Sequence, residues 1–213
     1  MTTIGIVAGG PKEELPDLNA YKTVTTWVGV DEGCLYILDS DQSLEVAIGD
    51  FDSVTQAEFN RIKRQTDVVK KVAVEKDQTD LELAISYVID LEPSLVYIFG
   101  ATGGRLDHAW MNMQLTHQFD QNSIESWICN KDNELTLKHP GTHIIKFDPR
   151  FSYISFLSMT ELVANFTVKD LKYDLSSKDI VFGSSLTISN EWTGKNGTYS
   201  FSSGILLVIK SRD

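Results

Sequence analysis

The sequence predicts two domains: an α/β domain with a mainly parallel sheet over residues 1–132, and an all-β sandwich domain over residues 133–213. Two observations predict this fold class. In the first half of the chain, β-rich runs of strand length alternate with helix-like segments, a pattern typical of parallel strands joined by helical crossovers. After about residue 124, short β-rich segments follow one another without a helical period, which is typical of a sandwich or barrel.

The first domain is expected to contain strands at residues 3–9, 23–30, 44–49, 68–74 and 94–100. Each is a short run rich in β-branched and other apolar residues, bounded by turn-forming residues. Helices are expected at residues 53–64, 81–92 and 107–118, after the third, fourth and fifth strands.

Two of these helices carry a start signal. Ser53 and Gln56 have the spacing of a capping box, and Thr79 and Glu82 repeat it before the second helix. In that second helix the apolar residues from Leu81 onwards recur at i, i+3, i+4, i+7 and i+8, which places them on one face.

The second domain is expected to be built from short strands only. The boundary is expected within residues 130–134, where polar residues cluster. The β-rich segments after residue 123 are 124–129, 142–147, 151–157, 164–168, 185–189, 197–201 and 204–210.

Composition excludes several classes of function. The net charge of −11 argues against a surface that binds nucleic acid or an anionic membrane, because both need basic patches. No apolar run is long enough for a signal peptide or a membrane span. The two cysteines, Cys34 and Cys129, lack a metal or redox spacing and are interpreted as reduced thiols of a cytoplasmic protein.

The residues that follow the expected strands indicate where chemistry takes place, because ligands bind at the carboxyl ends of strands in open α/β sheets. Acidic residues and glycines gather there, with two basic residues beside them. The acidic residues are Asp31, Asp50, Asp52, Asp77, Asp80 and Asp107; the glycines are Gly9, Gly10, Gly103 and Gly104; the basic residues are Lys76 and Arg105.

Converging carboxylates favour a bound cation. Two unit negative charges about 4 Å apart repel by about 4 kcal/mol at an effective dielectric constant of 20. Mg²⁺ suits an oxygen-lined site, and it usually completes its coordination with water and phosphate oxygens. Glycine turns allow backbone N–H groups to approach phosphate closely. The pattern therefore predicts a metal-bound polyphosphate.

Each feature also has a purely structural interpretation. An Asp-x-Asp pair after a strand is common as a helix cap or turn, although Ser53 can supply that cap by itself. Asp77 and Asp80 can interact with the positive end of the helix that they precede. A functional site is favoured because several separate strand ends each carry a carboxylate.

Three motifs resemble the thiamine pyrophosphokinase family. They are "GDFDS" at residues 49–53, "EKDQTDLELAI" at 75–85 and "GATGGRLDH" at 100–108, in this order and followed by a small β domain. The resemblance implies transfer of a pyrophosphoryl group from ATP to thiamine with Mg²⁺, giving thiamine diphosphate and AMP. It also implies a nucleotide- and metal-binding catalytic domain, a β-sandwich that binds thiamine and dimerises, and a homodimer.

The resemblance also implies roles for particular residues. The expected metal ligands are Asp31, Asp50, Asp52 and Asp77. Catalytic roles are expected for Asp50, Asp52, Asp77, Asp80, Arg105 and Asp107, with Asp80 or Asp107 accepting the proton of the attacking hydroxyl. The nucleotide is expected to contact Gly9, Gly10, Lys76, Gly103, Gly104 and Arg105. Thiamine is expected to contact Asp107, Tyr173, Ser189 and Asn190, with Tyr173 stacking on its ring or packing within the sandwich.

Three other functions fit the sequence less well. A phosphatase of the haloacid dehalogenase type also uses an Asp-x-Asp motif, but after the first strand rather than the third. A nucleotide-sensing scaffold would not need a row of carboxylates. A dinucleotide oxidoreductase is disfavoured because "AGGP" at residues 8–11 is not the G-x-G-x-x-G fingerprint.

Overall fold

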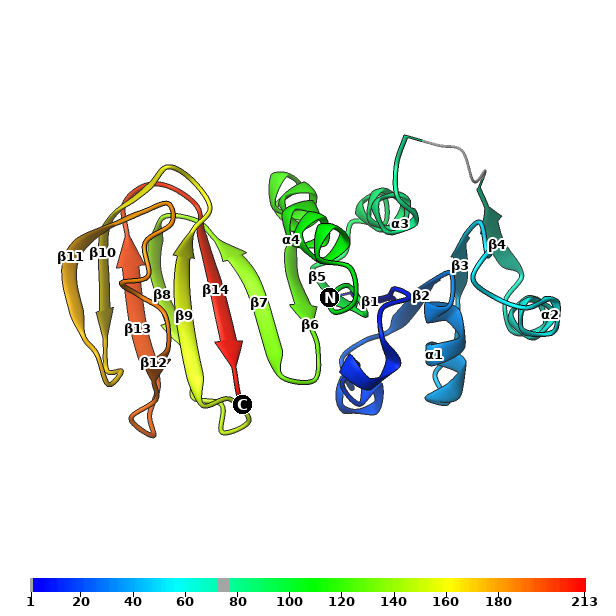
Figure 1. Cartoon of the computed structure of the whole chain (residues 1–213), viewed down its shortest axis with the longest axis horizontal. Coiled ribbons are helices and arrows are strands. Elements are labelled where there is room, and N and C mark those ends of the chain that lie inside the picture. The colour runs from blue at the N-terminus through cyan, green and yellow to red at the C-terminus, as the bar shows by residue number, and fades with distance from the viewer. Residues whose placement is uncertain (1, 73–76) are drawn as a thin grey trace. The chain divides into compact units, whose positions relative to one another are not determined.

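The computed structural model describes residues 2–72 and 77–213. The chain divides into two compact units, Met1–Lys131 and Asp132–Asp213, whose elements are labelled in Figure 1. The first unit is α/β and the second is an antiparallel β sandwich, which confirms the predicted fold class.

The first unit is built on parallel strands in the order β6-β5-β1-β2-β3-β4. β1 pairs with β2 on one side and with β5 on the other. The chain adds β2, β3 and β4 on one side of β1 and then β5 and β6 on the other side, so the strand order reverses between β1 and β5. The strands are β1 (Thr3–Val7), β2 (Thr26–Val30), β3 (Val46–Gly49), β4 (Val68–Lys71), β5 (Leu95–Phe99) and β6 (Glu125–Cys129).

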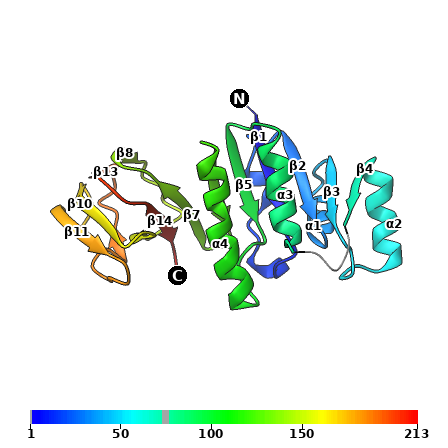
Figure 2. The same ribbon diagram turned by 90° about the horizontal axis from the view of Figure 1, so that it is seen from above.

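Helices cover both faces of these strands. Figures 1 and 2 show α3 and α4 on one face and α1 and α2 on the other. The helices are α1 (Gly33–Asp39), α2 (Gln56–Gln65), α3 (Asp80–Ile89) and α4 (Leu106–Gln121), and short 3₁₀ turns lie at Lys12–Glu14 and Leu18–Ala20.

The cap of α2 differs from the prediction. The helix is capped by Thr55, whose hydroxyl accepts the N–H of Glu58 while the Glu58 carboxylate accepts the N–H of Thr55. The predicted capping box of Ser53 and Gln56 is therefore wrong by two residues. The cap of α3 is as predicted, because the Thr79 hydroxyl accepts the N–H of Glu82.

The helix α1 was not predicted. It has only seven residues, too few to show a helical period, and most of its side chains are buried. Gly33 allows it to lie against β1, since a Cβ atom at this position would stand 2.0 Å from the carbonyl oxygen of Val7. The thiol of Cys34 is buried in α1, and burial, followed by the charge of Asp31, raises its pKa to about 12, so it is not a nucleophile.

The second unit contains two antiparallel groups of strands, in the orders β12-β9-β14-β7 and β11-β10-β13-β8. The strands are β7 (Asn133–Lys138), β8 (Gly141–Ile145), β9 (Tyr153–Ser158), β10 (Leu162–Lys169), β11 (Leu175–Val181), β12 (Asn190–Glu191), β13 (Gly197–Phe201) and β14 (Leu206–Ser211). The expected strand at residues 185–189 is wrong, because this segment forms turns, and β7 and β11 were not predicted.

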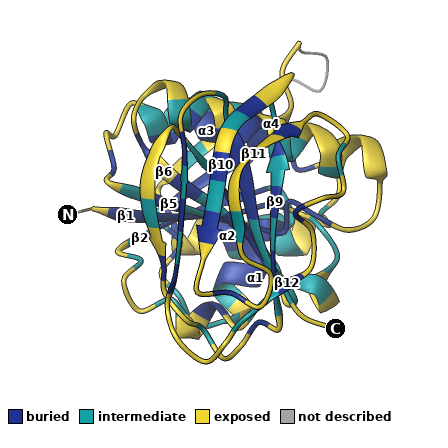
Figure 3. Ribbon diagram, turned by 90° about the vertical axis from the view of Figure 1, so that its left-hand side faces the viewer, coloured by how far each residue is buried: buried dark blue, intermediate teal, exposed yellow. Residues whose placement is uncertain are grey.

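Burial alternates along several strands of the second unit, as Figure 3 shows for β10. The inward side chains form one core, in which the Phe156 ring packs 5.0 Å from Phe166 and 5.1 Å from Tyr199 between ring centroids. β11 at the edge is mostly exposed, which explains why it lacks an apolar pattern.

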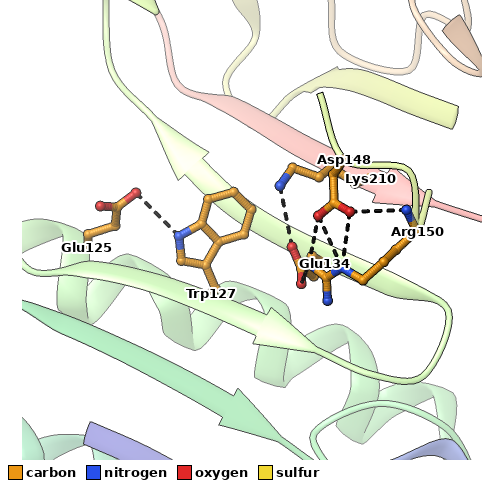
Figure 4. Close-up of polar contacts among 6 residues, drawn as sticks. All are labelled: Glu125, Trp127, Glu134, Asp148, Arg150 and Lys210. Carbon is orange, nitrogen blue, oxygen red and sulfur yellow. Dashed lines mark hydrogen bonds and ion pairs between the residues drawn. The ribbon is translucent and has the colours of Figure 1, made fainter. Parts of the chain in front are cut away.

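A charged network joins β7, β14 and the segment between β8 and β9 (Figure 4). Glu134 is only 7% exposed, and its carboxylate lies 2.8 Å from Nη2 of Arg150 and 3.4 Å from Nζ of Lys210. Asp148 binds the same guanidinium at 2.7 Å. The burial of Glu134 is therefore compensated by opposite charge. Elsewhere in Figure 4, the indole N–H of Trp127 in β6 donates to Glu125.

Among the residues that the structure describes, none of the helices is both long and apolar enough to cross a membrane. Both cysteines are buried and reduced.

Candidate active site

A cavity of about 560 Å³ lies at the carboxyl ends of the parallel strands of the first unit. It is lined by the loops that follow β1, β2, β3 and β5 and by the start of α3. The strand order reverses at this edge, between β1 and β5, which is where ligands bind in folds of this type.

Three carboxylates meet at this edge. Asp31 follows β2, Asp50 follows β3, and Asp80 is the first residue of α3; one oxygen from each lies within 4.8 Å of the others. At that separation each pair of charges repels by about 3.5 kcal/mol at an effective dielectric constant of 20. All three are half-buried, so a divalent cation with a preference for oxygen ligands fits the cluster.

The backbone around Asp31 is shaped to hold this side chain. Asp31 has a positive φ of 48°, and its Oδ1 accepts the N–H of Phe51 at 3.1 Å. Gly49 lies directly against it, with a φ of 148° and no side chain; a Cβ atom there would stand 1.9 Å from Asp31 Oδ1. The glycine of "GDFDS" therefore makes room for the Asp31 carboxylate.

The alternation of acidic and aromatic residues in this motif has a structural cause. Phe51, with a φ of 61°, is buried, and its ring packs 4.9 Å from the ring of Phe59 in α2. Asp50 belongs to the cluster, and its Oδ1 accepts the N–H of Asp52 at 3.0 Å. The helix cap belongs to Thr55, so capping does not explain either aspartate.

The other predicted ligands lie outside the cluster. Asp52 is exposed and lines the cavity. Asp77 is exposed and is not among the residues that line the cavity. Lys76 lies outside the described residues. The roles expected for Asp52, Asp77 and Lys76 stay predictions, and Asp80 occupies the third place in the cluster.

The four predicted glycines all line the cavity, and the structure needs glycine at these positions for different reasons. The N–H of Gly10 donates to the carbonyl of Gly100 at 2.9 Å, and a Cβ atom at Gly10 would stand 2.4 Å from that oxygen. Gly10 therefore joins the loops after β1 and β5 and does not direct its N–H to a phosphate. Gly103 and Gly104 have φ values of 86° and 64°, which glycine adopts without strain.

Arg105 and Asp107 form an ion pair at the start of α4. The guanidinium donates from Nε at 3.1 Å and from Nη2 at 2.6 Å to the two carboxylate oxygens of Asp107. This bidentate hydrogen bonding lowers the pKa of Asp107 to about 2. Both side chains are exposed, and a carboxylate with so low a pKa is a weak general base.

Several cavity residues were not singled out from the sequence. Glu32 and Tyr36 line the cavity from α1 and the residue before it, and Asn112 lines it from α4. Burial, then the charge and hydrogen bond of Glu32, raise the pKa of Tyr36 to about 12. Glu32 was detectable because it belongs to the short turn after the second strand, next to Asp31, whereas Tyr36 belongs to the helix that was missed.

The predicted thiamine residues of the second unit lie close to one another. Asn190 is buried; its Oδ1 accepts the N–H of Tyr173 at 3.0 Å and its Nδ2 donates to the Tyr173 carbonyl at 2.8 Å. The Tyr173 side chain is 54% exposed, with Nζ of Lys172 5.2 Å from its ring centroid. Ser189 has a φ of 54° and donates its N–H to Ser155. Asn190 thus holds the backbone of an exposed aromatic residue.

An acidic, glycine-lined cavity at the switch point of a parallel sheet, followed by a β sandwich, defines the class: a two-domain protein with a ligand-binding site in its α/β domain. The family model "Thiamin pyrophosphokinase, catalytic domain" matches residues 18–128, and "Thiamin pyrophosphokinase, vitamin B1 binding domain" matches residues 142–206. The chain belongs to the thiamine pyrophosphokinase family.

Individual relatives agree with this assignment. The chain is 41% identical over 214 residues to a thiamine pyrophosphokinase of Bacillus subtilis (strain 168), covering all of both chains. It is similar to the crystal structure of thiamine pyrophosphokinase from Bacillus subtilis, with a TM-score of 0.93 and 40% identity over all of both chains. A thiamin pyrophosphokinase family protein from Enterococcus faecalis gives a TM-score of 0.92 at 32% identity, again over all of both chains.

Family membership removes the alternatives. The "GDFDS" motif follows β3, so the haloacid dehalogenase interpretation fails on position as well as on family. The resemblance found from the three sequence motifs is confirmed.

Proposed function

We propose that the protein transfers a pyrophosphoryl group from ATP to the hydroxyl group of thiamine, giving thiamine diphosphate and AMP. The observation that carries this proposal is the convergence of Asp31, Asp50 and Asp80 within 4.8 Å beside a cavity of about 560 Å³. A cavity of this size suits a small cofactor or substrate, and its acidic edge suits the metal-bound end of a polyphosphate.

The proposed metal is Mg²⁺, held chiefly by Asp31, Asp50 and Asp80. When bound, Mg²⁺ neutralises charge on the phosphate oxygens and orients them. The donor set fits, because all three side chains supply carboxylate oxygens. Asp52, which lines the cavity, is proposed to accept hydrogen bonds from water molecules around this cluster.

The chain's own residues position the reactants. The thiamine oxygen forms a bond to the β-phosphorus, the bond from that phosphorus to the oxygen bridging the α- and β-phosphates breaks, and AMP leaves with the electron pair. Arg105 is proposed to stabilise phosphate charge, which requires it to share its guanidinium with Asp107 or release it.

The attacking hydroxyl must also lose a proton. Asp80 and Asp107 are the two candidate acceptors. The low pKa of Asp107 disfavours it while it is paired with Arg105. Asp80 lies in the acidic cluster and lines the cavity, so it is the acceptor that we favour.

We also propose that the second unit binds the thiamine ring through Tyr173, with Ser189 and Asn190 completing the contact. The support is that the buried Asn190 amide fixes the Tyr173 backbone while the Tyr173 ring stays exposed. The active form is proposed to be a homodimer located in the cytoplasm. Sedimentation of the purified protein tests the dimer directly.

Product analysis tests the proposed reaction. With thiamine, ATP and Mg²⁺, we expect AMP and thiamine diphosphate in equal amounts, measured by chromatography. Asp50→Asn should lose most turnover, while Asp67→Asn, at the opposite end of the strands just before β4, should retain it. Release of orthophosphate or ADP without thiamine diphosphate would contradict the proposal.

A further inference from the structure

Glu32 is a carboxylate in the cavity that the proposed reaction leaves without a role. It stands between Asp31 and α1, is half-buried, and lines the cavity together with Gly9 and Tyr36. A negative charge in a cavity proposed to hold a polyphosphate is unfavourable unless it faces hydrogen-bond donors.

Glu32 and Asp31 lie on opposite sides of the end of β2. The Asp31 carboxylate is directed at the loop after β3, where it accepts the N–H of Phe51 and lies against Gly49. Glu32 lies beside the loop after β1, because a Cβ atom built on Gly9 would stand 3.6 Å from the Glu32 Cβ. Asp31 and Glu32 therefore lie toward different loops, Asp31 toward the loop after β3 and Glu32 toward the loop after β1.

Tyr36 is a neighbour of Glu32 in the cavity. It lies one helical turn further along, its ring is buried, and its interaction with the Glu32 carboxylate contributes to the raised pKa of its phenol. An ionised carboxylate has about four acceptor positions, so Glu32 can accept further hydrogen bonds from a ligand. The result is a preoriented acceptor that needs an uncharged donor from the ligand.

We propose that Glu32 accepts hydrogen bonds from the 2′- and 3′-hydroxyl groups of the ribose of the bound nucleotide, with Tyr36 as its positioning residue. This inference rests on the proposed function, in which the cavity binds ATP. In this proposal the polyphosphate binds at Asp31, Asp50 and Asp80, and the sugar lies toward the loop after β1, beside Glu32.

The adenine amino group is the other uncharged donor on the nucleotide. Ribose is favoured because the sugar is attached directly to the phosphates, and Glu32 directly follows the proposed metal ligand Asp31 in the chain, whereas the base lies further along the nucleotide. Comparing nucleotides that lack one donor at a time separates the two.

Calorimetric binding of nucleotides in the presence of Mg²⁺ and the absence of thiamine tests the inference. The ligands are ATP, 2′-deoxy-ATP, 3′-deoxy-ATP and inosine triphosphate, which lacks the amino group. The wild-type protein should bind ATP at least tenfold more tightly than either deoxy form, as expected for a hydrogen bond to a charged acceptor. Glu32→Ala should reduce this ratio to near one, and Tyr36→Phe should reduce it partially. Glu13→Ala, on a neighbouring exposed glutamate outside the cavity, should keep the full ratio.

Every outcome decides the inference. No preference for ATP over the deoxy forms in the wild type overturns it, even where Glu32→Ala does not fold. Retention of the preference in Glu32→Ala also overturns it, as does an effect of this substitution confined to the amino group. A tenfold preference for ATP over the deoxy forms without thiamine turnover would support the ribose contact and refute the proposed function. Thiamine turnover without this preference would support the proposed function and refute the ribose contact.

Discussion

Gly49→Ala is the substitution that most sharply probes how the backbone builds the metal site. Gly49 has a φ of 148°, which an alanine adopts only with strain of about 1–3 kcal/mol. Its new Cβ atom would also stand 1.9 Å from Asp31 Oδ1, whereas real contacts of this kind are not found below 3.0 Å. The Asp31 carboxylate must therefore move by about 1 Å, the scale of misplacement that reduces turnover about 100-fold.

The matched control is Gly183→Ala. Gly183 also has a positive φ, of 82°, but a Cβ atom there would meet nothing within 4 Å. This variant carries backbone strain without a steric contact. Chemical denaturation should show both variants destabilised by about 1–3 kcal/mol, with a further loss for Gly49→Ala. Only Gly49→Ala should lose Mg²⁺-dependent turnover.

Equal turnover in the two variants would show that Asp31 does not need its observed position. A double variant, Gly49→Ala with Asp31→Ala, provides an additional check. Because the clash disappears with the carboxylate, this double variant should be more stable than Gly49→Ala alone, yet equally inactive.

Three further predictions follow from the two units. Tyr173→Ala should raise the KM for thiamine more than the KM for ATP, measured in steady-state assays, because the exposed ring is proposed to stack on thiamine. Asp80→Asn should reduce Mg²⁺ affinity at least tenfold in titrations monitored by nucleotide binding, and Asp77→Asn should reduce it less, since only Asp80 lies in the cluster. Asp148→Asn should reduce the loss of folding stability that the wild-type protein shows as the pH falls into the acid range. Burial raises the pKa of Asp148, but the hydrogen bonds from Arg150 outweigh burial, so the pKa in the folded protein is lowered. The ionised Asp148 therefore stabilises the fold at a pH above its unfolded pKa, and this stabilisation is lost as the pH falls through its folded pKa.

Each of these has a contrary result. A larger change in the KM for ATP would assign Tyr173 to packing. Equal losses for the two aspartate variants would place Asp77 at the metal after all. An unchanged acid limb in thermal unfolding of Asp148→Asn between about pH 2 and pH 5 would show that the Arg150 pair does not contribute to acid stability.

The sequence predicts the first unit well because its pattern is local. Strands ending in acidic or glycine turns reveal both the sheet and the edge where ligands bind, so Asp31 and Asp50 could be placed before the structure was known. The helix α1 escaped because seven residues hold less than two full helical repeats of pattern. The cap at Thr55 escaped because Ser53 and Gln56 have the same spacing as Thr55 and Glu58, and only backbone geometry distinguishes them.

The metal site shows what spacing alone does not determine. Asp77 and Asp80 both precede or begin α3, and only the three-dimensional position of Asp80 brings it to Asp31 and Asp50. The burial of Phe51 between Asp50, which belongs to the cluster, and the exposed Asp52 is likewise a tertiary effect. In the second unit, β11 is exposed on most of its length, so it lacks the alternation that identifies a strand.

The position of the cation is the most direct test of the proposed site. Crystals soaked with Mn²⁺ and ATP, with diffraction recorded near the manganese absorption edge, should show an anomalous peak within about 2.3 Å of carboxylate oxygens of Asp31, Asp50 and Asp80. A peak at Asp52 and Asp77 that leaves this cluster without metal would contradict the assignment, as would nucleotide bound without any metal at the three aspartates.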